Sequence, residues 1–169
     1  MGRINAWTMA HNIANDRLTG AGFVTDSPLV YQQYAPNPDF VIVAHSIYFQ
    51  ILGEHGYIGL ILYLAFWLST YALGGRIMKA AASHDDLAWA VTLADMIRVS
   101  LLGFAVGGAF LSLAYWDVPF YLFVILISTD RFVRQALAPN TESSPAGSLA
   151  HVQPLVSGGV THAKSHHEA

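Results

Sequence analysis

The sequence predicts an all-α integral membrane protein, and its composition and one long apolar run are the observations that predict it. Of the 169 residues, 54% are hydrophobic and only 11% are charged, whereas a soluble domain carries about a quarter charged residues. No charged side chain occurs from Tyr57 to Leu73. At about 1.5 Å of rise per helical residue, that run approaches the hydrocarbon thickness of a bilayer. We expect an extracytoplasmic amphipathic helix and loop, then about three transmembrane helices and a disordered C-terminal tail.

Charge and cysteine content exclude several classes of protein. The formal net charge of −3 provides no basic surface for nucleic acid. Because the chain has no cysteine, it can form neither a disulfide framework nor a thiolate metal site. The first residues also lack the basic start and apolar middle of a signal peptide.

Residues 2–15 predict an amphipathic helix. Ile4, Trp7 and Ala14 recur at helical spacing and form one apolar stripe. This helix either lies on the membrane surface or packs against other protein, and the pattern fits both. It should end near Asp16, because glycines follow closely.

Residues 17–44 predict an ordered loop. Prolines at 28, 36 and 38 should break any regular element, while interleaved aromatic residues can bury area. The whole chain then divides into an extracytoplasmic region, a transmembrane helical region and a disordered cytoplasmic tail: 1–56, 57–134 and 135–169. The expected spans are about 57–73, 91–114 and 117–131. The last of these is short, because its charge-free run ends at Thr129.

Two features of the second apolar run predict packing. Asp95 and Arg98 are three residues apart, so they share a helix face and can pair near the interface. Gly103 and Gly107 form a GxxxG pattern that would let another helix approach closely.

Basic residues predict the orientation. They follow the first and third apolar runs, at Arg76, Lys79, Arg131 and Arg134. The positive-inside rule places that side in the cytoplasm, so residues 1–56 face outward. These residues would then have to cross the membrane with no signal ahead of them. We therefore expect the chain to be the C-terminal part of a longer multi-pass protein.

A motif lies where the loop meets the first apolar run. His45-Ser46 is followed at fixed spacing by Gly56 and Gly59, which resembles the signature of the O-antigen ligase family. Upstream, GRINAW from residue 2 and GAGF from residue 20 resemble the arginine and glycine segments of that family's large extracytoplasmic loop. The strings HSIYFQILGEHGYIGL and YAPNP resemble most closely the exosortase-associated O-glycosylation ligases. The resemblance covers about residues 2–134.

The resemblance implies a glycosyltransferase in the bacterial cytoplasmic membrane, with its active face outside the cytoplasm. Its donor would be a polyprenyl-diphosphate-linked glycan and its acceptor a lipid or protein hydroxyl, with no cofactor. Carried onto this chain, His45 would be the general base and Arg3 would hold the diphosphate, with Arg17 as a second candidate. Substrate-binding positions would be Ser46, Gly20, Gly22, Gly56 and Gly59.

The carboxylates nearest this motif suggest a mechanism without metal. Asp26, Asp39 and Glu54 stand apart in the sequence, so no outward carboxylate pair is expected.

Alternatives remain for the residues and for the function. His45 could be an interfacial anchor, Ser46 only a helix N-cap, and Arg3 a contact for lipid phosphate. Arg17 could form only a local ion pair, and His55 is expected in the turn into the membrane. The alternative functions are a polysaccharide polymerase using the same donor class, or an inactive truncated membrane fragment.

Overall fold

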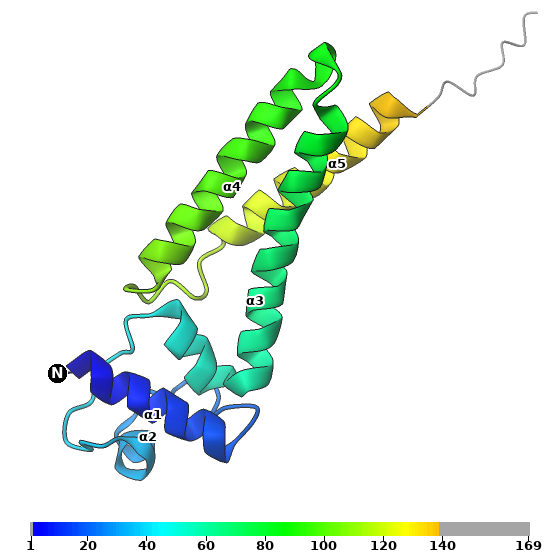
Figure 1. Cartoon of the computed structure of the whole chain (residues 1–169). Coiled ribbons are helices and arrows are strands. Elements are labelled where there is room, and N and C mark those ends of the chain that lie inside the picture. Colours follow the sequence, from blue (N-terminus) through cyan, green and yellow to red (C-terminus); the bar gives the residue numbers. More distant parts are fainter. Residues whose placement is uncertain (1, 139–169) are drawn as a thin grey trace, which may run out of the picture. The chain divides into compact units, whose positions relative to one another are not determined.

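The structure, a computed structural model, describes residues 2–138, and every regular element within them is a helix (Figure 1). Its elements are α1 (Gly2–Asp16), α2 (Pro28–Tyr34), α3 (Ile47–Ala81), the 3₁₀ turn η1 (Asp85–Leu87), α4 (Ala88–Gly108) and α5 (Val118–Leu137). The all-α prediction is confirmed for these residues. The expected tail lies outside them, apart from its first residues, which belong to α5 up to Leu137.

Helix α3 bends sharply at Gly56, whose φ of 64° and ψ of −164° are not helical. Only glycine adopts this backbone conformation without a steric penalty, because it has no Cβ. The bend divides α3 into a short outer segment, residues 47–55, and a long arm, residues 57–81 (Figure 1). The sequence predicted a turn at this place, and the structure makes it a kink within one helix.

The long arm of α3 and helix α4 have the length and apolar surface expected of membrane helices. Among the residues that the structure describes, two helices are long and apolar enough to cross a membrane, Ile47–Ala81 and Asp85–Gly108. Apolar side chains such as those of Leu68 and Val99 point outward, 70% and 62% exposed, which is the arrangement expected of a surface that faces lipid. Together with the length of these helices, that surface indicates a membrane protein.

Helix α5 packs against the same two helices, but its membrane crossing stays a prediction. Leu126 and Val133 of α5 are buried in one cluster with Ile77 of α3 and Ile97 of α4. Its last turns carry charges, including an ion pair of 2.7 Å between Arg134 Nε and Asp130 Oδ2. Helix α4 ends at Gly108 and a connection over residues 109–117 follows, so residues 109–114 of the second expected span lie outside the helix. The bounds of the spans stay a prediction.

Two predicted packing features of α4 differ in the structure. Arg98 forms no ion pair with Asp95 within the described residues; its guanidinium lies 4.1 Å from the centre of the Tyr71 ring instead. No atom lies within 4 Å of a Cβ built on Gly103 or Gly107. Within residues 2–138, the GxxxG pattern therefore contacts no second helix.

The N-terminal elements pack on one another through α1. Ala6, Met9 and Ile13 of α1 are buried with Tyr31 of α2. The buried face of α1 thus packs on protein and is rotated from the predicted stripe, because Ile4 is 66% exposed. Helix α1 ends at Asp16, as predicted.

Helix α2 corrects the expectation that residues 17–44 contain no regular element. Ser27 caps its first turn by accepting a hydrogen bond from Val30 N (3.4 Å), and Pro28 is the first helical residue. Proline is favoured there because that position has no intrahelical partner for an N–H, and its φ already suits a helix. The expectation that Pro28 breaks structure was therefore wrong.

Candidate functional site

His45 lies immediately before the outer segment of α3 in an unusual backbone conformation. Its φ is 47°, and within the described residues no other non-glycine residue has a positive φ. Such a conformation costs about 1–2 kcal/mol for an L-residue. The surroundings hold it in place: Trp7 Nε1 donates to Ala44 O at 2.8 Å, and Gln50 N donates to Ser46 O at 2.9 Å. His45 is half-buried, between a fixed carbonyl and the first turn of α3.

An aromatic stack joins α1 to α3 next to His45. The rings of Trp7 and Phe49 lie parallel, with 4.7 Å between centroids and 6° between planes. Arg3 is exposed and lies four residues before Trp7, so the two share one face of α1. Arg3 therefore lies about one helical turn from Trp7, whose indole N–H donates to the carbonyl group that precedes His45.

Arg17 lies at the other end of α1. It lies fourteen positions after Arg3, which is about 21 Å along a helix axis. Its Nε lies 3.7 Å from Asp16 Oδ2, and both side chains are more than half exposed. The structure therefore does not bring the two arginines together, and Arg17 makes the local ion pair that the sequence allowed.

Ser46 is buried, with 1% exposure, and is the N-cap residue of α3. Its hydroxyl makes no capping hydrogen bond. The structure therefore places Ser46 in the packing beside His45.

The predicted glycines join a loop to the kink of α3. Ala21 N donates to Gly53 O and Gly22 N donates to Glu54 O, each at 3.0 Å. Ile58 N would donate to Glu54 O in an unbroken helix, but it donates to Leu18 O at 3.4 Å. The 18–22 loop thus pairs with two carbonyl groups and one N–H group of α3 that the kink leaves without helical partners.

Each of these glycines has a conformational or packing reason to be glycine. Gly20 and Gly22 have φ values of 73° and 91°, and a Cβ on Gly20 would lie 2.5 Å from Glu54 O. A Cβ on Gly56 would collide with Leu18 O, and one on Gly59 would collide with His55 Cβ. The substrate-binding role of these positions stays a prediction beside that structural role.

Sequence reasoning missed a buried carboxylate cluster beside the kink. Glu54 is only 5% exposed and accepts hydrogen bonds from the Tyr115 hydroxyl and from Gln50 Nε2, the latter at 3.3 Å. The Tyr115 hydroxyl also lies 2.9 Å from His55 Nε2. Burial, together with the Glu54 carboxylate, raises the pKa of Tyr115 far above its usual value. His55 therefore lies at the bend as expected, but it also joins α3 to the 109–117 connection.

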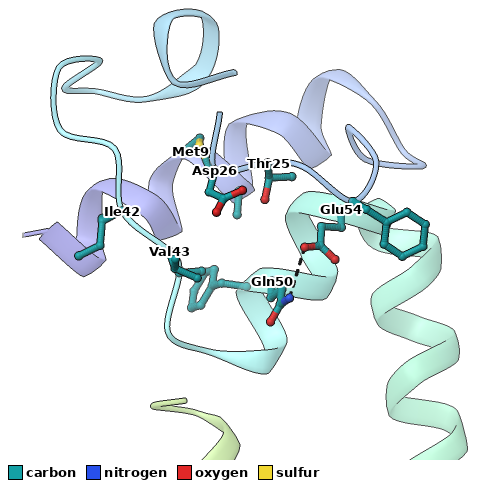
Figure 2. A pocket seen from close by; sticks show the side chains of 11 residues that line it. Met9, Thr25, Asp26, Ile42, Val43, Gln50 and Glu54 are labelled. Atoms are coloured by element: carbon teal, nitrogen blue, oxygen red, sulfur yellow. Dashed lines mark hydrogen bonds between the residues drawn. The ribbon is translucent and has the colours of Figure 1, made fainter. Parts of the chain in front are cut away.

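A cavity of about 150 Å³ opens between α1, the 23–26 loop, the 42–44 segment and the outer segment of α3. Figure 2 shows Thr25 and Asp26 pointing from the loop toward Gln50 and Glu54 of α3. Its lining is completed by Met9, Ala10, Phe23, Ile42, Val43, Ala44 and Phe49. This corrects the expectation that the carboxylates stand apart: Asp26 and Glu54 lie on one cavity. Asp39 is not among the lining residues. Within residues 2–138, no group of three or more His, Asp or Glu side chains could hold a metal ion.

The comparisons with known proteins concern this same region. Residues 1–64 match a family model described as O-antigen ligase. No curated protein and no solved structure matches the chain.

The matched residues include α1, α2, the loop with its glycines, His45 and the kink of α3. This match supports the similarity to O-antigen ligases that the His45–Gly59 motif predicted. Tyr115, α4 and α5 lie outside the match. The narrower resemblance to exosortase-associated ligases stays a prediction.

Proposed function

We propose that this chain takes part in glycan transfer at the outer face of the cytoplasmic membrane. The donor is a glycan linked to a polyprenyl diphosphate, and the acceptor is a hydroxyl group of a lipid or protein. The observation that carries the proposal is the placing of His45. It is held with a positive φ at the start of the helix that enters the membrane, inside the region that matches O-antigen ligase.

His45 acts as the general base in this proposal. The acceptor oxygen attacks the anomeric carbon of the donor, and the bond from that carbon to the diphosphate oxygen breaks. The acceptor proton passes to the imidazole, the side chain that most often serves as a general base. Strained backbone conformations recur at functional sites because the surrounding structure holds a group in place, and the fixed neighbours of His45 meet that condition.

Arg3 holds the departing diphosphate in this proposal. A guanidinium group is permanently charged and donates two parallel hydrogen bonds to phosphate oxygens. Its exposed position, one turn from Trp7, leaves the side chain free to meet a lipid headgroup near His45. Arg17, at the far end of α1, is the weaker candidate because of its distance along the helix.

The proposed orientation follows from charge. Arg76 and Lys79 lie at the end of the long arm of α3, the end opposite His45. With that end in the cytoplasm, His45 and Arg3 face outward, where a flipped lipid-linked donor is available.

The test replaces His45 by alanine in the chromosomal gene and measures transfer in isolated membranes supplied with the lipid-linked donor. We expect transfer to fall by a factor of about 10² to 10⁴, the usual contribution of a general base. His84→Ala is the matched control, because His84 is exposed in the connection between α3 and α4. Near-normal transfer by His45→Ala, at equal protein levels, would reject the base assignment.

A further inference from the structure

We propose that Arg98 and Lys79 form a binding site for the phosphate group of an anionic phospholipid. The site is a pocket between α3 and α4, which pack side by side (Figure 1). Lys79 lies at the end of the long arm of α3 opposite His45. The site is therefore separate from the proposed site of transfer, and the inference does not depend on that function.

The pocket is an open space of about 430 Å³ between the two helices. It is lined by Tyr71, Ala72, Gly75, Met78 and Lys79 of α3 and by Arg98 of α4. Gly75 contributes no side chain, and no atom lies within 4 Å of the place that a Cβ would take. Ligand sites typically have volumes of about 300–1,000 Å³. The pocket therefore has room for a headgroup phosphate together with the glycerol next to it.

Arg98 has only weak partners in the part of the chain that the structure describes. Its Nη1 donates to Met78 Sδ at 3.3 Å, and its guanidinium lies 4.1 Å from the centre of the Tyr71 ring. A thioether sulfur is a weak acceptor, and neither partner is a carboxylate. Because a guanidinium offers five N–H donors in a fork that matches phosphate, Arg98 can bind a phosphate without losing an ion pair.

The predicted membrane span puts the charge of Arg98 close to the phospholipid headgroups. About 20 helical residues cross the hydrocarbon core, and a count of that length from Tyr57 ends close to Met78. The stem of Arg98 lies against Gly74, where an added Cβ would be 2.8 Å from Arg98 Cγ, and its Nη1 reaches Met78. The side chain thus extends toward the end of the arm, as long basic side chains do when they place their charge at the interface.

The charge of the pocket favours an anionic lipid over a zwitterionic one. Lys79 and Arg98 line it, and the described lining includes neither Asp nor Glu. Asp95, one turn from Arg98 on α4, is not among the lining residues. Phosphatidylglycerol carries a net negative charge, whereas the ammonium group of phosphatidylethanolamine would be repelled by both cations. Basic pockets between transmembrane helices on the cytoplasmic side are known to bind lipid headgroups, and the proposed orientation places Lys79 on that side.

The experiment measures lipid binding to the 169-residue chain by native mass spectrometry from detergent micelles. The probes are phosphatidylglycerol and phosphatidylethanolamine with identical acyl chains, and inorganic phosphate is the soluble competitor. We expect phosphatidylglycerol to bind about tenfold more tightly than phosphatidylethanolamine, or more, because two basic side chains act on the difference in charge. Inorganic phosphate at the same concentration should not displace the lipid, since it lacks the acyl chains that contact the apolar helix surface.

Charge variants locate the binding. Arg98→Gln should weaken binding of phosphatidylglycerol by about ten- to hundredfold, the value of hydrogen bonds to a charged group. Lys79→Gln should weaken it by about fivefold, because Lys79 is an exposed lysine near the membrane surface. Arg131→Gln is the matched control and should change nothing, because Arg131 is exposed on α5 and does not line the pocket.

A further variant fills the pocket and keeps both charges. Gly75→Leu should abolish the preference for phosphatidylglycerol, because the new side chain occupies the space in front of Arg98. Leucine favours a helix more than glycine does, so the variant should unfold at no lower temperature than the parent. Gly103→Leu is its matched control: Gly103 is exposed in α4, has no atom within 4 Å of an added Cβ, and lies outside the pocket.

Three results would overturn the inference. The first is equal binding of the two lipids by the parent, and the second is equal binding of phosphatidylglycerol by Gly75→Leu and the parent. The third is displacement by inorganic phosphate, which would make the pocket a site for free anions. If neither lipid binds at all, the first result holds, and Arg98 would be left to a carboxylate of another protein segment.

Discussion

Gly56→Ala should open the contact between the 18–22 loop and α3. An alanine at this φ and ψ costs about 1–3 kcal/mol, since the region is nearly exclusive to glycine. Its Cβ would also collide with Leu18 O and lie 2.7 Å from Gly20 N. The loop must then withdraw and lose its hydrogen bonds, each worth about 0.5–1.5 kcal/mol. Together these effects should reach about 3 kcal/mol, or about a hundredfold in the opening equilibrium.

The assay is amide hydrogen exchange of Ala21 and Gly22, whose N–H groups donate to Gly53 O and Glu54 O. We expect exchange at both to accelerate by about a hundredfold in Gly56→Ala, because local opening controls exchange. Gly75→Ala is the control on the same helix: it is helical, and no atom lies within 4 Å of its added Cβ. That change should leave both amides protected. Unchanged protection in Gly56→Ala would refute the account of the kink.

The remaining predictions concern stability, orientation and donor binding. Tyr115→Phe removes a donor from buried Glu54, so the free energy of unfolding should fall by about 1–3 kcal/mol in detergent. Because the pKa of Tyr115 is raised in the folded chain, its hydroxyl contributes stability that is present at neutral pH and is lost as pH rises above the pKa of an unfolded tyrosine, about 10. Thermal unfolding of Tyr115→Phe should therefore depend less on pH in that range; an equal dependence would contradict the assignment. A reporter fused after Lys79 should report the cytoplasm and one within 26–40 the outside, and a cytoplasmic signal from the loop would reject the orientation. Arg3→Lys should lower both donor affinity and turnover, since it keeps the charge but loses the planar fork, and transfer kinetics equal to the parent would exclude Arg3 as the diphosphate group.

The long apolar helix and the end of the first helix could be predicted, because composition and glycine positions are local signals in the sequence. The charge-free run from Tyr57 identified the long arm of α3, and Gly20 and Gly22 marked the end of α1. Pro28 was misread because proline is compatible with a first helical turn as well as with a break, and only the cap at Ser27 distinguishes the two. The predicted apolar face of α1 differs from the buried face because Trp7 lies at the margin of the packed surface, where its indole donates a hydrogen bond.

The candidate site was only partly predictable, because its partners come from distant parts of the chain. The His45 motif could be found by its spacing, whereas the Tyr115 hydroxyl reaches Glu54 across 61 residues. The cavity arises because a kink in α3 and the loop before α2 bring Asp26 and Glu54 together. No local sequence pattern predicts that Asp26 and Glu54 line one cavity, because the tertiary packing of distant segments brings them there.

The contact between the 18–22 loop and the kink has a consequence for how this sequence can change. Gly20 and Gly56 are each required by the backbone of the other segment, so a substitution at one alters what the other can tolerate. Neighbouring positions that share contacts give non-additive effects. Gly20→Ala and Gly56→Ala combined should therefore cost less than the sum of the two separate changes, because the first already breaks the contact. A change in the loop and a change at the bend therefore cannot be judged separately, because each segment limits the side chains that the other can carry.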